Sequence, residues 1–200
     1  IMAEATRRKR LRSRGEEQTL TGRSLAMIFE KNSTRTRVSF EVAMREMGGN
    51  PIVLQKDDLQ LGRGETVADT ARVLSRYVHA MMLRAYHHAT LLELAQYATV
   101  PVINGLTNLL HPCQVMADVM TIEEKIGDVA DKRIAWVGDG NNMANTWITM
   151  ATKLPMDLVL ACPKNLPSDL GILEAAQRAG AKVTLVTAPE EAVAGADVVM

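Results

Sequence analysis

Short apolar runs and longer amphipathic segments alternate along almost the whole chain. The apolar runs at 24–29, 51–55, 80–83 and 100–105 have the length and composition of strands that are buried on both faces. The segments between these runs space their apolar residues three or four positions apart, which is the period of a helix with one buried face. This alternation predicts an α/β fold in which parallel sheets are flanked by helices.

A long helical pattern at 112–127 interrupts the alternation, which then starts again. We therefore expect two doubly wound domains joined by a long helix. The first spans 1–127 and includes 112–127 as the linking helix, and the second spans 128–200 and is truncated. The chain starts inside a helical pattern and stops in an apolar run, so we expect it to be a piece of a longer protein.

The composition is that of a globular protein, with 47% apolar residues, 23% charged residues and a formal net charge of zero. This balance gives no general attraction to nucleic acid or to a membrane, so any anion site must be local. A basic cluster at 7–14 has acidic residues on both sides. We interpret it as the solvated face of a helix that ends near Gly15, and not as a nucleic-acid patch or a targeting sequence.

Two cysteines, Cys113 and Cys162, lie in separate apolar segments and have no metal-ligand spacing. We expect reduced thiols and a cytoplasmic protein, or a protein of the mitochondrial matrix if it comes from a eukaryote and has lost a transit peptide. No apolar run approaches the roughly 20 residues that span a bilayer.

The stretch 29–37, Phe-Glu-Lys-Asn-Ser-Thr-Arg-Thr-Arg, lies where the first predicted strand is followed by a helix. The first turn of a helix carries unpaired N–H groups and a partial positive charge, and both favour an anion. Ser33, Thr34 and Thr36 add hydroxyl groups, and the guanidinium of Arg35 can bind two phosphate oxygens at once. The stretch predicts a phosphate-binding loop, although a helix cap with solvated arginines would use the same residue types.

Two further candidates also follow apolar strands. Arg84 comes just after the third strand, and His111-Pro112-Cys113-Gln114 opens the long helix. Pro112 suits the first helical position, which places His111 near the N-cap and Gln114 about one turn into the helix. Ligands of open α/β sheets bind beyond the carboxyl ends of the strands, so we expect these residues to face one crevice.

Together, Phe-Glu-Lys-x-Ser-Thr-Arg-Thr-Arg, an arginine about fifty residues later and His-Pro-x-Gln resemble the signatures of the aspartate/ornithine carbamoyltransferase family. The local sequence is closer to the ornithine branch. The resemblance implies that carbamoyl phosphate and L-ornithine react to give citrulline and phosphate, without a cofactor or a metal. Aspartate, acylornithine or putrescine as the acceptor stays open, because the amino-acid loops of the family are missing from the chain. A non-catalytic interaction protein that kept the fold is the alternative of a different class.

The resemblance also implies a role for each residue of the carbamoyl-phosphate half. Residues 33–36 hold the phosphate, and Gln60 and Gln114 belong to the same binding site, with Gln114 on the carbamoyl amide. Thr36, Arg84 and His111 are the catalytic residues, which donate hydrogen bonds to the carbonyl oxygen. Gln60 matches the family position that reaches into a neighbouring subunit's site, so a homotrimer or a multiple of it is implied.

The segment Gly138-Asp139-Gly140-Asn141-Asn142 follows a strand and precedes a helix, as a dinucleotide fingerprint does. However, Met143 stands where the third glycine belongs, and Cys162-Pro163 stands where an acidic residue would end the next strand. The sequence therefore does not favour a nicotinamide site. The ornithine branch carries Asp-Gly-Asn-Asn here, and the resemblance implies that Asn142 contacts the amino acid.

Overall fold

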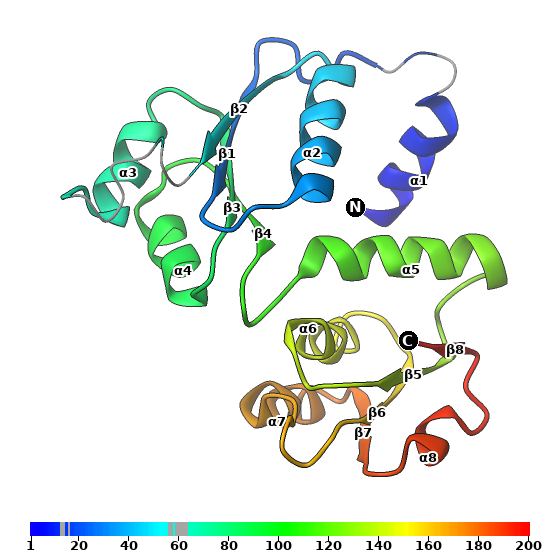
Figure 1. Ribbon diagram of the computed structural model, residues 1–200. Helices are drawn as coiled ribbons and strands as arrows, with labels where there is room; N and C mark the ends of the chain where they lie inside the picture. The colour runs from blue at the N-terminus through cyan, green and yellow to red at the C-terminus, as the bar shows by residue number, and fades with distance from the viewer. Residues whose placement is uncertain (13–14, 16, 56–57, 59–63) are drawn as a thin grey trace. The chain divides into compact units, whose positions relative to one another are not determined.

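A computed structural model describes residues 1–12, 15, 17–55, 58 and 64–200. The chain packs as two compact units, Ile1–Asn108 and Leu109–Met200, which are described one at a time. Each unit contains a four-stranded parallel sheet with helices packed on it, as Figure 1 shows. The predicted α/β fold is therefore confirmed. None of the helices in the described parts of the chain is long and apolar enough to cross a membrane.

The first unit alternates helices and strands from its first residues. In chain order they are α1 (Met2–Leu11), β1 (Ser24–Phe29), α2 (Thr34–Glu46), β2 (Asn50–Gln55), α3 (Val67–Leu74), β3 (Ala80–Arg84), α4 (His88–Tyr97) and β4 (Val102–Leu106). The strand order is β2-β1-β3-β4, and all three pairings are parallel. Parallel strands end at the same edge of a sheet, so the segments that follow β1, β3 and β4 leave the sheet side by side.

β1 is buried on both faces, which explains its unbroken apolar sequence. Ala26 and Ile28 lie in an apolar cluster with residues of α3 and α4. Met27 and Phe29 point to the opposite face and lie in a cluster with Met44 of α2. The strand that leads into the predicted phosphate-binding loop is thus held by packing on two sides.

α1 carries no buried residue, in agreement with its interpretation as a solvated helix. Glu4 accepts hydrogen bonds of 2.8 Å from Arg7 and Arg8, and the bond from Arg7 contributes most to a pKa of Glu4 lowered to about 2. The helix ends at Leu11, so the prediction that it ends near Gly15 is wrong. Like charges four positions apart, as at Arg8 and Arg12, disfavour a longer helix.

The second unit starts the alternation again. Its elements are α5 (Pro112–Ile126), β5 (Arg133–Val137), α6 (Asn142–Met150), β6 (Asp157–Ala161), α7 (Leu170–Arg178), β7 (Lys182–Val186), α8 (Pro189–Val193) and β8 (Val198–Val199). The strand order is β7-β6-β5-β8, again with parallel pairing throughout. α5 packs with this unit, although a helix that joins two units can be assigned to either. The domain boundary predicted at 127 therefore stays a prediction.

Candidate functional site

The phosphate-binding loop predicted from the sequence forms the start of α2. Ser33 is the N-cap residue, and its Oγ accepts a hydrogen bond of 3.3 Å from the backbone N–H of Thr36. No acidic residue lies in the first turn of the helix. The partial positive charge at this helix end is therefore not neutralised within the turn, which makes it suited to an external anion.

Arg84, the last residue of β3, reaches this helix end from the neighbouring strand. Its Nη1 donates a hydrogen bond of 3.3 Å to Oγ1 of Thr36. Burial lowers the pKa of Arg84, and the positive charge of Arg35 lowers it further, which places two guanidinium groups within electrostatic reach of each other. Among the residues that the structure describes, no carboxylate pairs with either guanidinium. Two positive charges without a counter-ion make a strong local site for an anion.

The main chain around Arg84 is fixed on both sides. Glu30 donates its N–H to the carbonyl oxygen of Arg84 at 3.0 Å, and Oε2 of Glu30 accepts from the N–H of Tyr86 at 3.3 Å. On the other side, the register of β3 and β4 shifts. Leu83 pairs with Asn104 and Arg84 pairs with Leu106, so Gly105 has no paired residue in β3. A Cβ at Gly105 would displace the side chain of Met82 and would lie 3.2 Å from the carbonyl oxygen of Leu83, so the irregularity favours glycine there.

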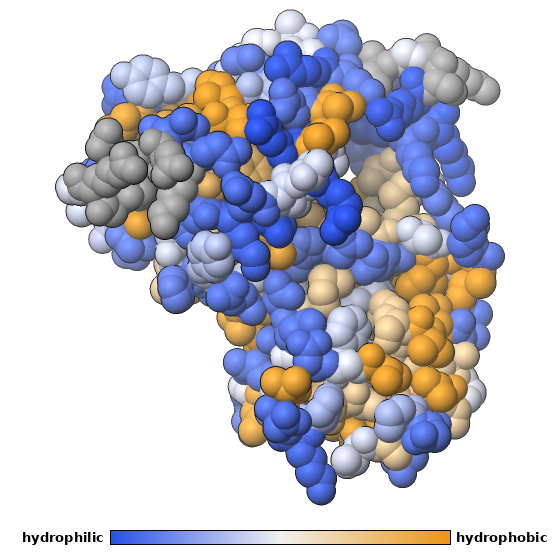
Figure 2. Space-filling model, viewed as in Figure 1, coloured by the Kyte–Doolittle hydropathy of each residue, from blue (hydrophilic) through white to orange (hydrophobic). Residues whose placement is uncertain are grey.

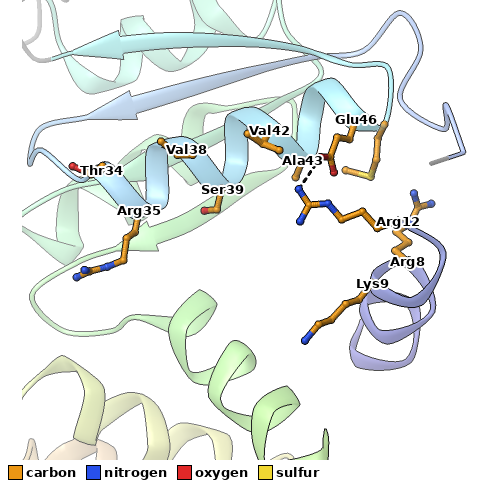
Figure 3. Close-up of a pocket in the computed structure, with 11 residues that line it drawn as sticks. Arg8, Lys9, Arg12, Thr34, Arg35, Val38, Ser39, Val42, Ala43 and Glu46 are labelled. Carbon is orange, nitrogen blue, oxygen red and sulfur yellow. Dashed lines mark hydrogen bonds and ion pairs between the residues drawn. The ribbon is translucent and has the colours of Figure 1, made fainter. Parts of the chain in front are cut away.

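A hollow of about 770 Å³ lies along the outer face of α2 and opens between this helix and α1. Figure 3 shows Thr34 and Arg35 at the first turn of α2, and Arg12, the residue that follows α1, opposite the last turn of α2. Arg12 forms an ion pair of 2.7 Å with Glu46. Figure 2 shows a mainly hydrophilic surface over α1. The charge of Arg12 is thus compensated, in contrast with that of Arg35.

In the second unit, α5 begins as the sequence predicts, with His111 at the N-cap and Pro112 at the first helical position. The backbone N–H of His111 donates a hydrogen bond of 2.8 Å to Oγ1 of Thr146 on α6. Gln114 donates from Nε2 to Oδ1 of Asp118 at 2.8 Å. A carboxylate only accepts hydrogen bonds, so Oε1 of Gln114 is left as the acceptor of the amide.

Asn142 is the first residue of α6, and Asn141 caps the helix by accepting from the N–H of Met143 at 2.7 Å. The turn before α6 passes close to the segment 166–168. Gly140 donates its N–H to the carbonyl oxygen of Leu166 at 2.8 Å, and a Cβ on Gly140 would collide with the backbone at 167–168. This close backbone approach gives Gly140 a packing role that involves no nucleotide.

The structure thus brings part of the predicted site together within each unit. Residues 33–36 and Arg84 meet at the start of α2, while His111 and Asn142 are linked through Thr146. Gln60 lies outside the described residues. Among the described residues, no three His, Cys, Asp or Glu side chains gather as a metal site would require.

Four residues support these groups through contacts that the sequence did not predict: Glu30, which lies inside the quoted signature, and Gly105, Asp118 and Thr146. Gly105 alone carried a usable signal, because a glycine inside a strand pattern often marks a bulge. The other three are ordinary polar residues, whose partners become visible only once the fold is known.

Two family models match the chain. Residues 1–124 match "Aspartate/ornithine carbamoyltransferase, carbamoyl-P binding domain", and residues 130–200 match "Aspartate/ornithine carbamoyltransferase, Asp/Orn binding domain". The two matches divide the chain close to the predicted start of the second domain.

Curated relatives match over nearly the whole chain. The ornithine carbamoyltransferase of Methanoculleus marisnigri is 54% identical over 199 residues, which are 99% of this chain and 64% of the relative. That of Archaeoglobus fulgidus is 56% identical over 180 residues, which are 90% of this chain and 59% of the relative. The chain therefore spans less than two thirds of the length of these relatives.

Solved structures of ornithine carbamoyltransferases are also similar to nearly the whole of this chain. The ornithine carbamoyltransferase from Pyrococcus furiosus is similar with a TM-score of 0.94 and 48% identity, covering 99% of this chain and 65% of that one. A mitochondrial ornithine carbamoyltransferase from Coccidioides immitis is similar with a TM-score of 0.91 and 36% identity, covering 99% of this chain and 68% of that one.

Proposed function

Because the chain belongs to the aspartate/ornithine carbamoyltransferase family, we propose that the complete protein transfers the carbamoyl group of carbamoyl phosphate to the δ-amine of L-ornithine. The products are citrulline and phosphate. Ornithine is favoured over aspartate because the relatives at 54% and 56% identity are ornithine carbamoyltransferases. The Asp-Gly-Asn-Asn sequence at 139–142, which is typical of the ornithine branch, supports the same choice.

The observation that carries the proposal is the pair of guanidinium groups, Arg35 and Arg84, at the start of α2, neither of which has a carboxylate partner among the described residues. In the proposed complex, residues 33–36 bind the phosphate group of carbamoyl phosphate. The ligand's negative charge relieves the repulsion between the two arginines, and backbone N–H groups of the first turn add hydrogen bonds. An anionic substrate therefore stabilises the arrangement that binds it.

The proposed transfer is a direct attack of the neutral δ-amine on the carbonyl carbon. Negative charge then builds on the carbonyl oxygen, where Thr36, Arg84 and His111 donate hydrogen bonds. Each such donor is worth about 3 kcal/mol in comparable oxyanion sites. The bond between the carbonyl carbon and the phosphate oxygen breaks, and the departing phosphate takes up the proton that the amine loses. This scheme uses no protein nucleophile, metal or cofactor.

Gln114 holds the carbamoyl NH₂ group in this scheme. Its own NH₂ group is occupied by Asp118, so Oε1 is the atom that accepts from the ligand. Asn142 at the start of α6 contacts ornithine. Neither cysteine forms a disulfide within the described part of the chain, which fits the reducing cytoplasm as the proposed location.

We further propose a homotrimer, or a multiple of it, in which Gln60 completes the carbamoyl-phosphate site of a neighbouring subunit. Gln60 lies outside the described residues, so the support comes from its sequence context in the family.

An acceptor panel tests the function. The complete protein is incubated with carbamoyl phosphate and, separately, L-ornithine, L-aspartate, N-acetylornithine or putrescine, and the carbamoylated products are separated by chromatography. We expect citrulline from ornithine and much slower reactions with the other amines. If carbamoyl-aspartate or carbamoyl-putrescine were the main product, the acceptor would be aspartate or putrescine and not ornithine. No product with any amine, from protein that binds carbamoyl phosphate, would favour a non-catalytic protein.

A further inference from the structure

A single buried hydroxyl group, that of Thr146, connects His111 and Asn142, two of the three proposed site residues of the second unit. Thr146 lies on α6 and is 4% exposed. Its Oγ1 donates to the carbonyl oxygen of Asn142 and accepts the backbone N–H of His111 at 2.8 Å. We propose that Thr146 is a positioning residue that holds the main chain of His111 for the transfer step, an inference that rests on the proposed function.

The direction of each hydrogen bond follows from the chemistry of the hydroxyl group. A hydroxyl has one proton, and Thr146 donates it to Asn142, one turn earlier in the same helix. The oxygen is then left to accept, and the N–H of His111 is a donor that α5 itself cannot satisfy, because it lies at the helix N-cap. The two bonds polarise each other in a buried setting, which strengthens both.

Burial on α6 supports a positioning role for this hydroxyl. Asn145 and Thr146 are 5% and 4% exposed on a helix whose other buried residues include Trp147 and Ile148. Buried polar groups destabilise a protein unless they are hydrogen-bonded. Asn145 accepts from the N–H of Asp169 at 3.0 Å and donates to the carbonyl oxygen of Leu109 at 3.4 Å. Both polar side chains thus hold the segment that carries His111.

Thr149, on the same helix, provides a matched control. Its hydroxyl donates to the carbonyl oxygen of Asn145 at 2.9 Å, which is the same bond to the preceding turn that Thr146 makes. Within the described part of the chain, no group donates to Oγ1 of Thr149. The two threonines therefore share the bond to the preceding turn and differ in two respects: Thr146 accepts from His111 and is buried, whereas Thr149 lies at an exposed position.

The expected kinetic effect falls on the transition state. His111 is proposed to stabilise charge that develops on the carbonyl oxygen, so displacement of its main chain lowers kcat. Misplacement of a catalytic group by about 1 Å can cost on the order of a hundredfold in rate. The proposed phosphate-binding residues 33–36 belong to the other unit and are held by their own strand and helix, so the KM for carbamoyl phosphate is expected to change little.

The experiment compares three variants of the complete protein: Thr146→Val, Thr146→Ser and Thr149→Val. Thr146→Val keeps the shape and removes the hydroxyl, and we expect kcat to fall between roughly tenfold and a hundredfold. The KM for carbamoyl phosphate should stay within about twofold. Thr146→Ser, which keeps the hydroxyl, should restore most of kcat, and Thr149→Val should behave as wild type.

Hydrogen exchange at the backbone amide of His111 gives a readout that needs no turnover. It should accelerate in Thr146→Val and stay slow in Thr146→Ser and Thr149→Val. Unchanged exchange in Thr146→Val, or accelerated exchange with wild-type kcat, would overturn the positioning role. If Thr146→Val does not fold, a reduced kcat in Thr146→Ser together with wild-type amide protection would overturn it as well. Absence of citrulline with wild-type protein would instead overturn the proposed function. The exchange rates would still report whether Thr146 holds the backbone amide of His111.

Discussion

Arg35 and His111 should affect different kinetic constants of the complete protein. In the proposed scheme Arg35 binds phosphate before and during the reaction, so its contribution is the same in the ground state and in the transition state. A hydrogen bond to a charged group contributes about 1.5–3 kcal/mol, so Arg35→Ala should raise the KM for carbamoyl phosphate roughly ten- to a hundredfold. His111→Ala removes a donor to the carbonyl oxygen and should mainly lower kcat, by about a hundredfold. Steady-state kinetics separate the two effects.

Arg45→Ala is the control for Arg35→Ala. Arg45 lies in the last turn of the same helix, is 64% exposed at its side chain and pairs with Glu41 at 3.2 Å. Its loss should leave both constants unchanged, because exposed ion pairs contribute little. A partial loss of kcat in Arg35→Ala is compatible with the scheme, since the phosphate is also the leaving group. The oxyanion role of His111 would be wrong if His111→Ala kept kcat and only weakened substrate binding.

At the scale of single elements, the turn between β5 and α6 depends on one of its two glycines. A Cβ on Gly140 meets the backbone at 167–168, which cannot move aside as a side chain can, whereas a Cβ on Gly138 meets only the ring of Trp136 at 3.7 Å or more. Overpacking of this kind costs about 1–3 kcal/mol, occasionally more. We expect Gly140→Ala to lower the Tm by roughly 5–10 °C.

Gly138→Ala is the matched substitution in the same turn and should shift the Tm by no more than about 2 °C. Thermal unfolding followed by far-UV circular dichroism measures both variants against the wild type. Equal shifts for the two substitutions would contradict the close backbone approach, and so would a Gly140→Ala protein as stable as the wild type.

The elements themselves could be predicted because their signals are local. Pro112 fixes the start of α5, and the unbroken apolar sequence of β1 reflects burial on both faces. Helix ends and helix faces were less predictable. α1 ends at Leu11, before the expected glycine, and Val38 on α2 is 53% exposed although it fits the helical period. The sequence of α2 is apolar on more than one side, so periodicity alone could not select the buried face.

The supporting contacts could not be predicted, because each one joins residues that are far apart in the chain. The bond between His111 and Thr146 spans 35 residues, and the bond between Arg84 and Thr36 spans 48. The second pair was expected through the family resemblance, since both residues belong to known motifs. Thr146 belongs to no motif, and a threonine inside a helix gives no sign of its partner.

At the scale of the whole molecule, the described residues divide the proposed chemistry between the two units. The first unit carries residues 33–36 and Arg84, and the second carries His111, Gln114 and Asn142. The carbamoyl-phosphate domain model covers residues 1–124 and so includes His111 and Gln114 of the second unit, whereas Asn142 falls within the amino-acid domain model at 130–200. Gln60 concerns the assembly of complete subunits, because it is proposed to complete the site of a neighbouring subunit.

Subunit mixing tests whether Gln60 serves a neighbouring site. Complete Arg84→Ala protein and complete Gln60→Ala protein should each be nearly inactive. If every site combines Arg84 of one subunit with Gln60 of the next, random exchange at equal amounts leaves about a quarter of the sites with both residues intact. Citrulline formation in the mixture should therefore recover to about a quarter of the wild-type rate, once exchange has been confirmed by mass spectrometry of differently labelled subunits.

A second mixture supplies the control. Arg84 and His111 are proposed to serve the same site from the same subunit, so each site in a mixture of Arg84→Ala and His111→Ala proteins keeps one lesion. That mixture should stay inactive under the same exchange conditions. If the Arg84→Ala and Gln60→Ala mixture also stayed inactive despite measured exchange, the shared site would be wrong, and Gln60 would act, if at all, within its own subunit. Recovery in both mixtures would show that the assignment of Arg84 and His111 to one subunit's site is wrong.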